Sequence, residues 1–383
     1  MRFRNWWVAL PVYPLLLIAV TAHGAEPLLE KTTLWEQNTA GYAIFRIPGI
    51  VVTRAGTVLA YVEARKAART DWGESDIQIR RSTDGGRTFA AAAQIGHMDE
   101  AFPKNPAAIA RNQGIGMGTT YNNPVAIADR NGAVHFLFCV EYMRAFYMRS
   151  DDDGRTFSKP VEITAAFESL RKTYAWVVLA TGPGHGIQLR NGRLLVPVWL
   201  SLGTQGNGHG PSVTATIYSD DHGMTWKAGE IAGPDTPEIP SPNETTAVQL
   251  GDGRVMLNMR SPSARQRRVV TFSKDGATHW SAPVFDDQLF EPVCFASMVR
   301  MAKNRLLFVN PDSALRQRRN LTVRLSEDDG RTWKIKRAIE PGPSAYADLA
   351  VLRDGTIVCF YESGIAGPYE ALTLARFNLE WLK

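Results

Sequence analysis

An eight-residue pattern that recurs along the chain limits the possible folds more than any other feature. Each copy reads Ser-x-Asp-x-Gly-x-Thr followed by Phe or Trp, and intact copies lie at 82–89, 150–157, 219–226 and 326–333. A damaged copy at 273–280 keeps Ser273, Asp275 and Trp280 but has Ala277 and His279 where Gly and Thr belong. Repeats spaced by roughly 50 to 70 residues are typical of solenoids, propellers or arrays.

The chemistry of the octet favours a tight turn at a hairpin tip. Gly reaches positive φ without strain, Asp bonds its own backbone, and Ser and Thr hydroxyls close the same turn. Strand-like runs precede the copies, for example residues 77–80, 145–148 and 321–325. We therefore expect each octet to end a strand and to direct its terminal aromatic ring between two sheets.

These octets resemble the Asp-box, or BNR repeat, of the sialidase (neuraminidase) family. The resemblance implies an all-β fold, a six-bladed β-propeller, in which the boxes lie on the outer rim away from the active centre. The octets therefore predict the fold and not the catalytic residues.

The amino terminus predicts an export signal. Arg2 and Arg4 precede an apolar run over residues 6–20, and Ala22-His23-Gly24 has the small-x-small pattern of a cleavage site. We interpret residues 1–24 as a signal peptide and 25–383 as one catalytic propeller domain, exported to the periplasm or secreted, with no membrane span after cleavage. An uncleaved membrane anchor is the alternative, although the apolar run is short for a span.

Charge and cysteine content exclude several classes of function. The formal net charge is +5, or +3 without Arg2 and Arg4, which suits an anionic substrate. No aromatic stacking series accompanies the basic cluster at residues 316–319, so we do not expect nucleic-acid binding.

The three cysteines, Cys139, Cys294 and Cys359, lie in strand-like runs and are expected to be buried thiols. Without Cys-x-x-Cys or His-rich spacing, no metal and no other cofactor is predicted.

Arg46 is a candidate binding residue because it lies in the apolar run Phe45-Arg46-Ile47-Pro48. A buried guanidinium needs an anion or several carbonyls as partners. The four residues match the sialidase Phe-Arg-Ile-Pro signature, whose Arg is the first of three that hold the carboxylate of the sugar. The alternative is a structural ion pair.

A charged loop follows the strand over residues 59–65. The resemblance implies a substrate-binding role for Arg65 and an acid/base Asp on this loop. Family spacing favours Asp71, with Asp76 as the alternative. A loop near water suits a proton shuttle.

A predicted hairpin spans residues 244–260, with its turn at Gly251-Asp252-Gly253. Glu244 stands at its start and Arg260 at its end, so the hairpin brings both to one end of a sheet. The segment looks like the sialidase hairpin that carries the catalytic Glu and the second carboxylate-binding Arg. The alternative is a cross-strand ion pair of small energetic value.

The run Arg316-Gln317-Arg318-Arg319-Asn320-Leu321 resembles the segment that carries the third carboxylate-binding Arg, which implies Arg318, with Arg316 and Arg319 as alternatives.

Two residues near the carboxyl end complete the resemblance. Tyr346 resembles the nucleophilic Tyr of the family, and Glu362 the Glu that orients the first Arg.

The glycine-rich turn Gly182-Pro183-Gly184-His185-Gly186 resembles a family turn near the ligand, so His185 is a weaker candidate for substrate contact. Residues 203–210 read as a rim loop.

These residue types suit the hydrolysis of sialic acid glycosides. Three Arg side chains bind the carboxylate on the anomeric carbon with fork-like bonds that Lys cannot reproduce. That carboxylate repels an Asp or Glu nucleophile, whereas a neutral Tyr avoids the repulsion if a base removes its proton. We expect the neighbouring Arg charges to lower the pKa of Tyr346.

The sequence thus predicts a monomeric, metal-independent, retaining exo-α-sialidase that acts on sialylated glycans of glycoproteins, glycolipids and oligosaccharides. The alternatives are a hydrolase for a related nonulosonic acid, a trans-sialidase, and a non-catalytic Asp-box propeller that binds glycans.

Overall fold

Alternating apolar and polar residues and frequent Gly-containing turns produce a chain made mostly of strands. The computed structural model describes residues 1–3, 5, 26–67 and 70–383. The signal peptide predicted over residues 1–24 therefore lies outside the described residues, apart from 1–3 and 5. The helical elements in the described part are α1 (Pro106–Ile109), α2 (Leu379–Leu382) and the 3₁₀ helix η1 (Thr164–Lys172). The all-β prediction is confirmed, and no helix in the described part is long and apolar enough to cross a membrane.

The described strands form five hydrogen-bonded sheets. The first contains β2 (Ile44–Val52), β3 (Val58–Arg65), β4 (Ser75–Ser82) and β5 (Ala93–Ile95). The second contains β11 (Gly184–His185), β6 (Tyr121–Ala128), β7 (Val134–Val140), β8 (Arg144–Ser150) and β9 (Val161–Glu162). The third contains β10 (Val178–Thr181), β12 (Ile187–Gln188), β13 (Leu194–Gln205), β14 (Gly210–Ser219) and β15 (Lys227–Gly233). The fourth contains β16 (Thr245–Gln249), β17 (Val255–Met259), β18 (Arg267–Ser273) and β19 (Val284–Phe290).

The fifth sheet has seven strands because β23 belongs to two neighbouring groups of strands. Its order is β1 (Leu29–Glu36), β25 (Ala371–Phe377), β24 (Ile357–Ser363), β23 (Ile335–Val351), β22 (Arg319–Ser326), β21 (Arg305–Pro311) and β20 (Ser297–Ala302). The first half of β23 pairs with β22 and the second half with β24.

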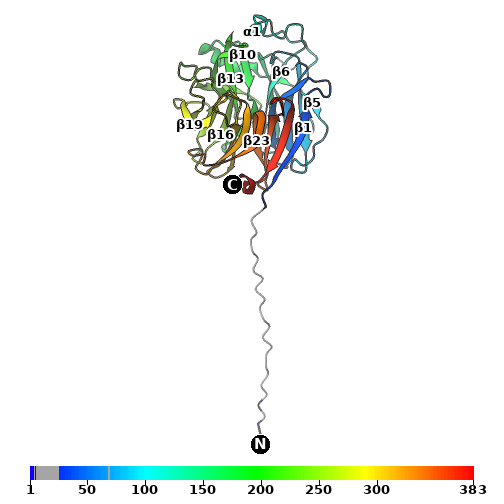
Figure 1. Ribbon diagram of the computed structural model, residues 1–383, viewed down its shortest axis with the longest axis vertical. Coiled ribbons are helices and arrows are strands. Elements are labelled where there is room, and N and C mark those ends of the chain that lie inside the picture. Colours follow the sequence, from blue (N-terminus) through cyan, green and yellow to red (C-terminus); the bar gives the residue numbers. More distant parts are fainter. Residues whose placement is uncertain (4, 6–25, 68–69) are drawn as a thin grey trace.

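Strand β1 joins the two ends of the described chain. It pairs antiparallel with β25, from Leu29 opposite Phe377 to Glu36 opposite Ala371. Figure 1 shows this blue strand beside the red carboxyl-terminal strands.

Each octet follows a strand, as predicted. It lies between the third and fourth strands of its group. In the first copy, Ser82 Oγ donates to Asp84 Oδ1 over 2.7 Å and accepts from Gly86 N over 2.8 Å. Thr88 Oγ1 donates to Asp84 Oδ2 over 2.6 Å. The damaged copy makes the same bonds from donors that lie one residue earlier. Gly276 N donates to Ser273 Oγ, and Thr278 Oγ1 donates to Asp275 Oδ2.

The aromatic residues that end the octets pack against the hydrophobic clusters as expected. Trp226 and Trp333 are buried in two of these clusters, and Phe89, Phe157 and Trp280 are partly buried against three others. Each turn is thereby tied to the core.

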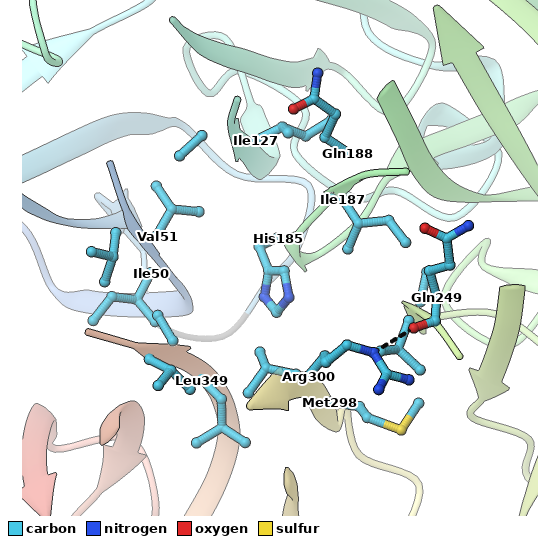
Figure 2. Close-up of a pocket in the computed structure, with 18 of the residues that line it drawn as sticks. Ile50, Val51, Ile127, His185, Ile187, Gln188, Gln249, Met298, Arg300 and Leu349 are labelled. Carbon is cyan, nitrogen blue, oxygen red and sulfur yellow. Dashed lines mark hydrogen bonds between the residues drawn. The ribbon is translucent and has the colours of Figure 1, made fainter. Parts of the chain in front are cut away.

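The first strand of each group faces a common axis. Strand β2 contacts β6 and β23, and β20 contacts β16 and β23. Figure 2 shows Ile50, Ile127, Ile187, Met298 and Leu349, from five different inner strands, around one axial cavity. Sheets arranged in this way around an axis make a β-propeller.

Candidate active site

A cleft of about 180 Å³ gathers most of the residues that the sequence analysis singled out. Its walls come from loops and strand ends of several sheets. It is lined by Arg46, Ile47, Arg65, Asp71, Asn123, Tyr142, Trp199, Asn207, His209, Asn243, Glu244, Arg260, Arg318 and Tyr346. Seven of the eight predicted site residues are in this set, and Glu362 lies directly behind it.

Three guanidinium groups surround the ring of Tyr346. The guanidinium carbons of Arg46 and Arg318 lie 5.4 Å and 5.2 Å from the ring centroid. Arg260 Nη1 donates to the Tyr346 hydroxyl over 2.7 Å. These positive charges come from β2, from the segment before β22 and from the end of β17, so they meet only in the folded chain.

Glu244 and Tyr346 form a hydrogen-bonded pair. The hydroxyl of Tyr346 lies 2.6 Å from both carboxylate oxygens of Glu244, to which it donates. Glu244 also forms a salt bridge with Arg260, whose backbone N–H donates to the Glu244 carbonyl over 3.0 Å. The hairpin β16–β17 therefore places Glu244 and Arg260 side by side, as its residue pattern predicted.

The expected lowering of the pKa of Tyr346 is wrong. Burial raises the pKa of this phenol most strongly, and the nearby Glu244 raises it further, whereas Arg260 and Arg318 lower it too little to compensate. The net pKa lies well above 10.0, and the side chain is only 4% exposed. The phenol is therefore neutral and available as a donor to Glu244.

Glu362 links the backbone of Tyr346 to Arg46. Its Oε2 accepts from Tyr346 N over 3.0 Å. Its Oε1 accepts from Arg46 Nε over 2.5 Å and from Ile47 N over 3.2 Å. A fully buried carboxylate with these three donors holds the first guanidinium in a fixed orientation.

Arg65 and Asp71 form a second charged group across the cleft. Arg65 binds Glu63 through Nε and Nη2 over 2.8 Å and 2.6 Å, and binds Asp71 Oδ1 through Nη1 over 2.7 Å. Asp71 Oδ2 also accepts from Asn207 Nδ2 over 3.1 Å. Burial raises the pKa of Asp71, but Arg65, His209 and Arg46 together hold it well below its usual range. Asp71 is therefore a carboxylate in this structure.

The alternatives that the sequence left open lie outside the cleft. Asp76, on β4, accepts from the Tyr42 hydroxyl and from Gln94, each over 2.7 Å. Arg316 donates to the carbonyls of Pro262 and Ser263. Arg319 is exposed at the start of β22.

The sequence analysis missed part of the cleft wall. Asn207 and His209 belong to the turn between β13 and β14, which was read only as a rim loop. The ring of His209 lies 4.8 Å to 5.2 Å, between centroids, from those of Tyr142, Trp199 and Trp72. No local pattern distinguishes these side chains, because the cleft wall is assembled from segments that lie far apart in the chain.

Tyr369 was also missed. Its hydroxyl accepts from Arg318 Nη1 over 2.6 Å, and its ring lies 4.1 Å from the guanidinium carbon of Arg46. The Tyr369 side chain therefore contacts the guanidinium groups of both Arg46 and Arg318.

His185, the candidate in the glycine-rich turn, does not line this cleft. It lies in the axial cavity shown in Figure 2, where Nδ1 is 2.7 Å from Asp348 Oδ1. The expectation that it contacts substrate is not supported by this position.

The cysteine prediction is confirmed, since Cys139, Cys294 and Cys359 are free and buried. Within residues 26–67 and 70–383, no group of three or more His, Cys, Asp or Glu side chains is placed to hold a metal ion.

Comparison with known proteins agrees with the fold. The model of the BNR repeat-like domain matches residues 104–359. A sialidase of Micromonospora viridifaciens is 30% identical over 390 residues, covering 94% of this chain and 55% of the relative. A sialidase of Bacteroides fragilis is 28% identical, covering 85% of this chain and 61% of the relative. The chain thus spans little more than half the length of these two relatives.

A solved structure, the Hadza microbial sialidase Hz136, superposes with a TM-score of 0.73 at 26% identity, covering 90% of this chain and 67% of that one. The chain belongs to the BNR repeat-like domain family, and sialidases of that family are its relatives.

Proposed function

We propose that the chain is a retaining exo-α-sialidase that hydrolyses terminal sialic acids from glycoconjugates. The observation that carries the proposal is the neutral Tyr346 phenol, hydrogen-bonded to Glu244 and surrounded by Arg46, Arg260 and Arg318. A protein that only binds glycans has no need for a phenol and a carboxylate paired in this way.

The three guanidinium groups suit the carboxylate of a sialic acid. Arg46 and Arg318 are held by Glu362, Tyr369 and a backbone carbonyl, so little side-chain freedom is lost when the anion binds. Charge-assisted, fork-shaped bonds to a carboxylate are the interactions that Arg provides best. In the proposed complex they place the anomeric carbon beside the Tyr346 hydroxyl.

The first chemical step forms a bond between the phenol oxygen of Tyr346 and the anomeric carbon. The phenolic proton passes to Glu244 as that bond forms, and the bond from the anomeric carbon to the leaving oxygen breaks. A neutral phenol approaches a carbon that carries a carboxylate without the charge repulsion that a carboxylate nucleophile meets. Arg260 Nη1, 2.7 Å from the phenol oxygen, stabilises the negative charge that develops there.

Asp71 is assigned the second proton-transfer role. It protonates the departing oxygen and then removes a proton from the water that attacks the anomeric carbon, while the phenolate leaves and recovers its proton from Glu244. Two displacements at one carbon retain its configuration. We propose that sugar hydroxyl groups take over the donors of Arg65, which weakens the ion pair that keeps Asp71 ionised and allows it to carry a proton.

The proposal also covers the number of blades, the export signal, the catalytic domain and the substrates. We infer six blades, because the two halves of β23 pair with separate groups of strands and the seven-stranded sheet then counts as two blades. We propose that residues 1–24 direct export, that residues 25–383 are the catalytic domain, and that sialylated glycans are the substrates.

The test is release of 4-methylumbelliferone from its α-N-acetylneuraminic acid glycoside by purified protein in the presence of a chelator. Proton NMR of the first product then gives the stereochemistry. We expect turnover with α-N-acetylneuraminic acid formed first. Folded protein without turnover, or the β-anomer as the first product, contradicts the proposal.

A further inference from the structure

His185 occupies a central position in the propeller without lining the cleft. Figure 2 shows its ring in the middle of the axial cavity, with Ile50, Leu349 and Met298 around it. This cavity has a volume of about 410 Å³, and no residue of the described chain lines both it and the cleft. The proposed reaction leaves this histidine without a role.

The partner of His185 is a fully buried carboxylate. Nδ1 of His185 lies 2.7 Å from Asp348 Oδ1, and the histidine side chain is 10% exposed. Burial lowers the pKa of His185, but the charge and hydrogen bond of Asp348 outweigh burial, so the pKa is raised. Breaking a buried pair of this kind by removing one partner is costly, because it leaves an uncompensated charge.

Asp348 connects β23 to three other inner strands at the axis. Besides His185 on β11, its Oδ1 accepts from Ser297 Oγ on β20 over 2.7 Å. Its Oδ2 accepts from Ile50 N on β2 over 2.9 Å. One side chain thus fixes the position of β23 relative to β2, β11 and β20.

The same segment of β23 carries Tyr346. Asp348 follows Tyr346 by two residues in β23, just past the register shift between Ser344 and Ala347. Rigid displacement of this segment along or across the axis therefore moves the phenol oxygen relative to Glu244, which belongs to a different sheet.

The glycine-rich turn also supports the ring of Tyr346. Phe295 lies 5.9 Å from Tyr346 between ring centroids. Gly184 has a φ of +80°, and a Cβ there would lie 2.6 Å from Phe295 Cζ. The turn therefore packs against Phe295 through a glycine, while the next residue, His185, binds Asp348.

We propose that His185 is a positioning residue for Tyr346: its hydrogen bond with Asp348 holds β23 where the phenol stays within hydrogen-bonding reach of Glu244. This inference rests on the proposed function and adds to it a residue that acts from the axial cavity, outside the cleft. Displacements of about 1 Å in a reacting group reduce rates by roughly 100-fold.

The test compares His185→Ala, His185→Gln and His185→Asn with wild type, using the 4-methylumbelliferyl sialoside. The amide nitrogen of Asn can occupy the place of Nδ1 and donate to Asp348, whereas that of Gln lies nearer the place of Nε2. We expect Ala and Gln to lower kcat roughly 10- to 100-fold with KM changed less than about threefold, and Asn to recover most of kcat. Ile187→Val, which shortens a side chain of the same cavity without touching Asp348, is the matched control and is expected to keep wild-type kcat.

A purely structural role predicts a different result. In one such outcome, the variants lose thermal stability but their folded fraction keeps the wild-type kcat. In the other, His185→Asn and His185→Gln lose activity equally. Either result overturns the inference. If His185→Ala does not fold, the comparison of Asn with Gln decides.

A crystal structure of His185→Gln supplies a readout that is independent of activity. We expect the distance from Tyr346 Oη to the nearer Glu244 oxygen to exceed 3.5 Å, and an unchanged 2.6 Å would contradict the inference. Wild-type protein without sialidase activity refutes the proposed function instead, so the two failures are distinguishable.

Discussion

The Tyr346 hydroxyl donates to Glu244, which lies 102 residues earlier in the chain, over 2.6 Å to either carboxylate oxygen. Both residues are buried, and Arg260 contacts each of them. In the proposed reaction this phenol, carboxylate and guanidinium form a proton-transfer unit in which the base is already within reach of its proton.

Replacing Tyr346 with Phe removes the proposed nucleophile and leaves the ring in place. We expect kcat on the 4-methylumbelliferyl sialoside to fall by roughly 10³-fold or more. Binding of a sialic acid analogue, measured by calorimetry, is expected to stay within about a factor of ten, because the three guanidinium groups remain. Tyr361→Phe alters another buried phenol, whose hydroxyl contacts Glu340 and not the cleft, and should keep wild-type kinetics. Near-normal hydrolysis by Tyr346→Phe would show that the assignment is wrong.

Arg318 and Arg316 provide a matched pair for the binding of the substrate carboxylate. Lys in place of Arg318 keeps the charge but loses the fork that reaches Tyr369 and the Val293 carbonyl. We expect kcat/KM to fall about 30-fold, or about 2 kcal/mol. Arg316→Lys exchanges a residue that lies outside the cleft and donates to the carbonyls of Pro262 and Ser263, and it should have little effect. A large fall in kcat/KM for Arg316→Lys, with little change for Arg318→Lys, would instead make Arg316 the third carboxylate-binding residue.

Asp71→Ala should affect substrates according to their leaving groups. Natural sialosides with aliphatic leaving oxygens need protonation, and we expect their hydrolysis to slow roughly 10²- to 10⁴-fold. The phenolic 4-methylumbelliferone departs with little assistance, so its release should slow much less in the first step. Asp76→Ala, which changes a carboxylate bonded to Tyr42 and Gln94, is the control. If Asp76→Ala shows the dependence on the leaving group instead, Asp71 is not the acid.

The Asp-boxes should contribute to stability in a pH-dependent way. Slight burial raises the pKa of Asp221, but bonds from Thr225 and Ser219 outweigh it and lower this pKa to about 2. A depressed folded-state pKa stabilises the fold above the unfolded value of about 4, and this contribution disappears as the pH falls through about 2.

We therefore expect Asp221→Asn to unfold roughly one to two degrees below wild type at pH 7, corresponding to about 1 kcal/mol at an exposed site. The difference should shrink toward pH 2. Asp220→Asn, which alters the exposed partner of Arg193 in the same turn, should change Tm less. Thermal unfolding at several pH values checks this, and a difference that is constant with pH would contradict it.

Local patterns allowed much of the fold and cleft to be predicted. The octets fix where third strands end, because their hydrogen bonds involve residues within one turn. The segment around Arg46 and the hairpin from Glu244 to Arg260 could be identified because each resembles a short sialidase motif. Even the damaged octet forms its turn, since Gly276 and Thr278 replace the expected partners one position earlier.

Other features depend on distances that no short segment encodes. The charges beside Tyr346 predict a lowered pKa, but burial, which no short segment of sequence reveals, outweighs them and raises it. The resemblance predicts His185 near the ligand, whereas the chain directs its ring into the axial cavity, toward Asp348. Asn207 and His209 became recognisable only when the β13–β14 turn was seen beside Asp71.

The most direct test of the central claim is to trap the bond to Tyr346. A 2,3-difluoro sialic acid carries a good leaving group, while the fluorine at C3 slows the second displacement, so the intermediate should accumulate. Peptide mapping by mass spectrometry is then expected to locate the sugar on the peptide containing Tyr346, with no adduct in Tyr346→Phe. An adduct on Glu244 or Asp71, or no adduct in a preparation that hydrolyses the 4-methylumbelliferyl sialoside and is inactivated by the reagent, would contradict Tyr346 as the nucleophile.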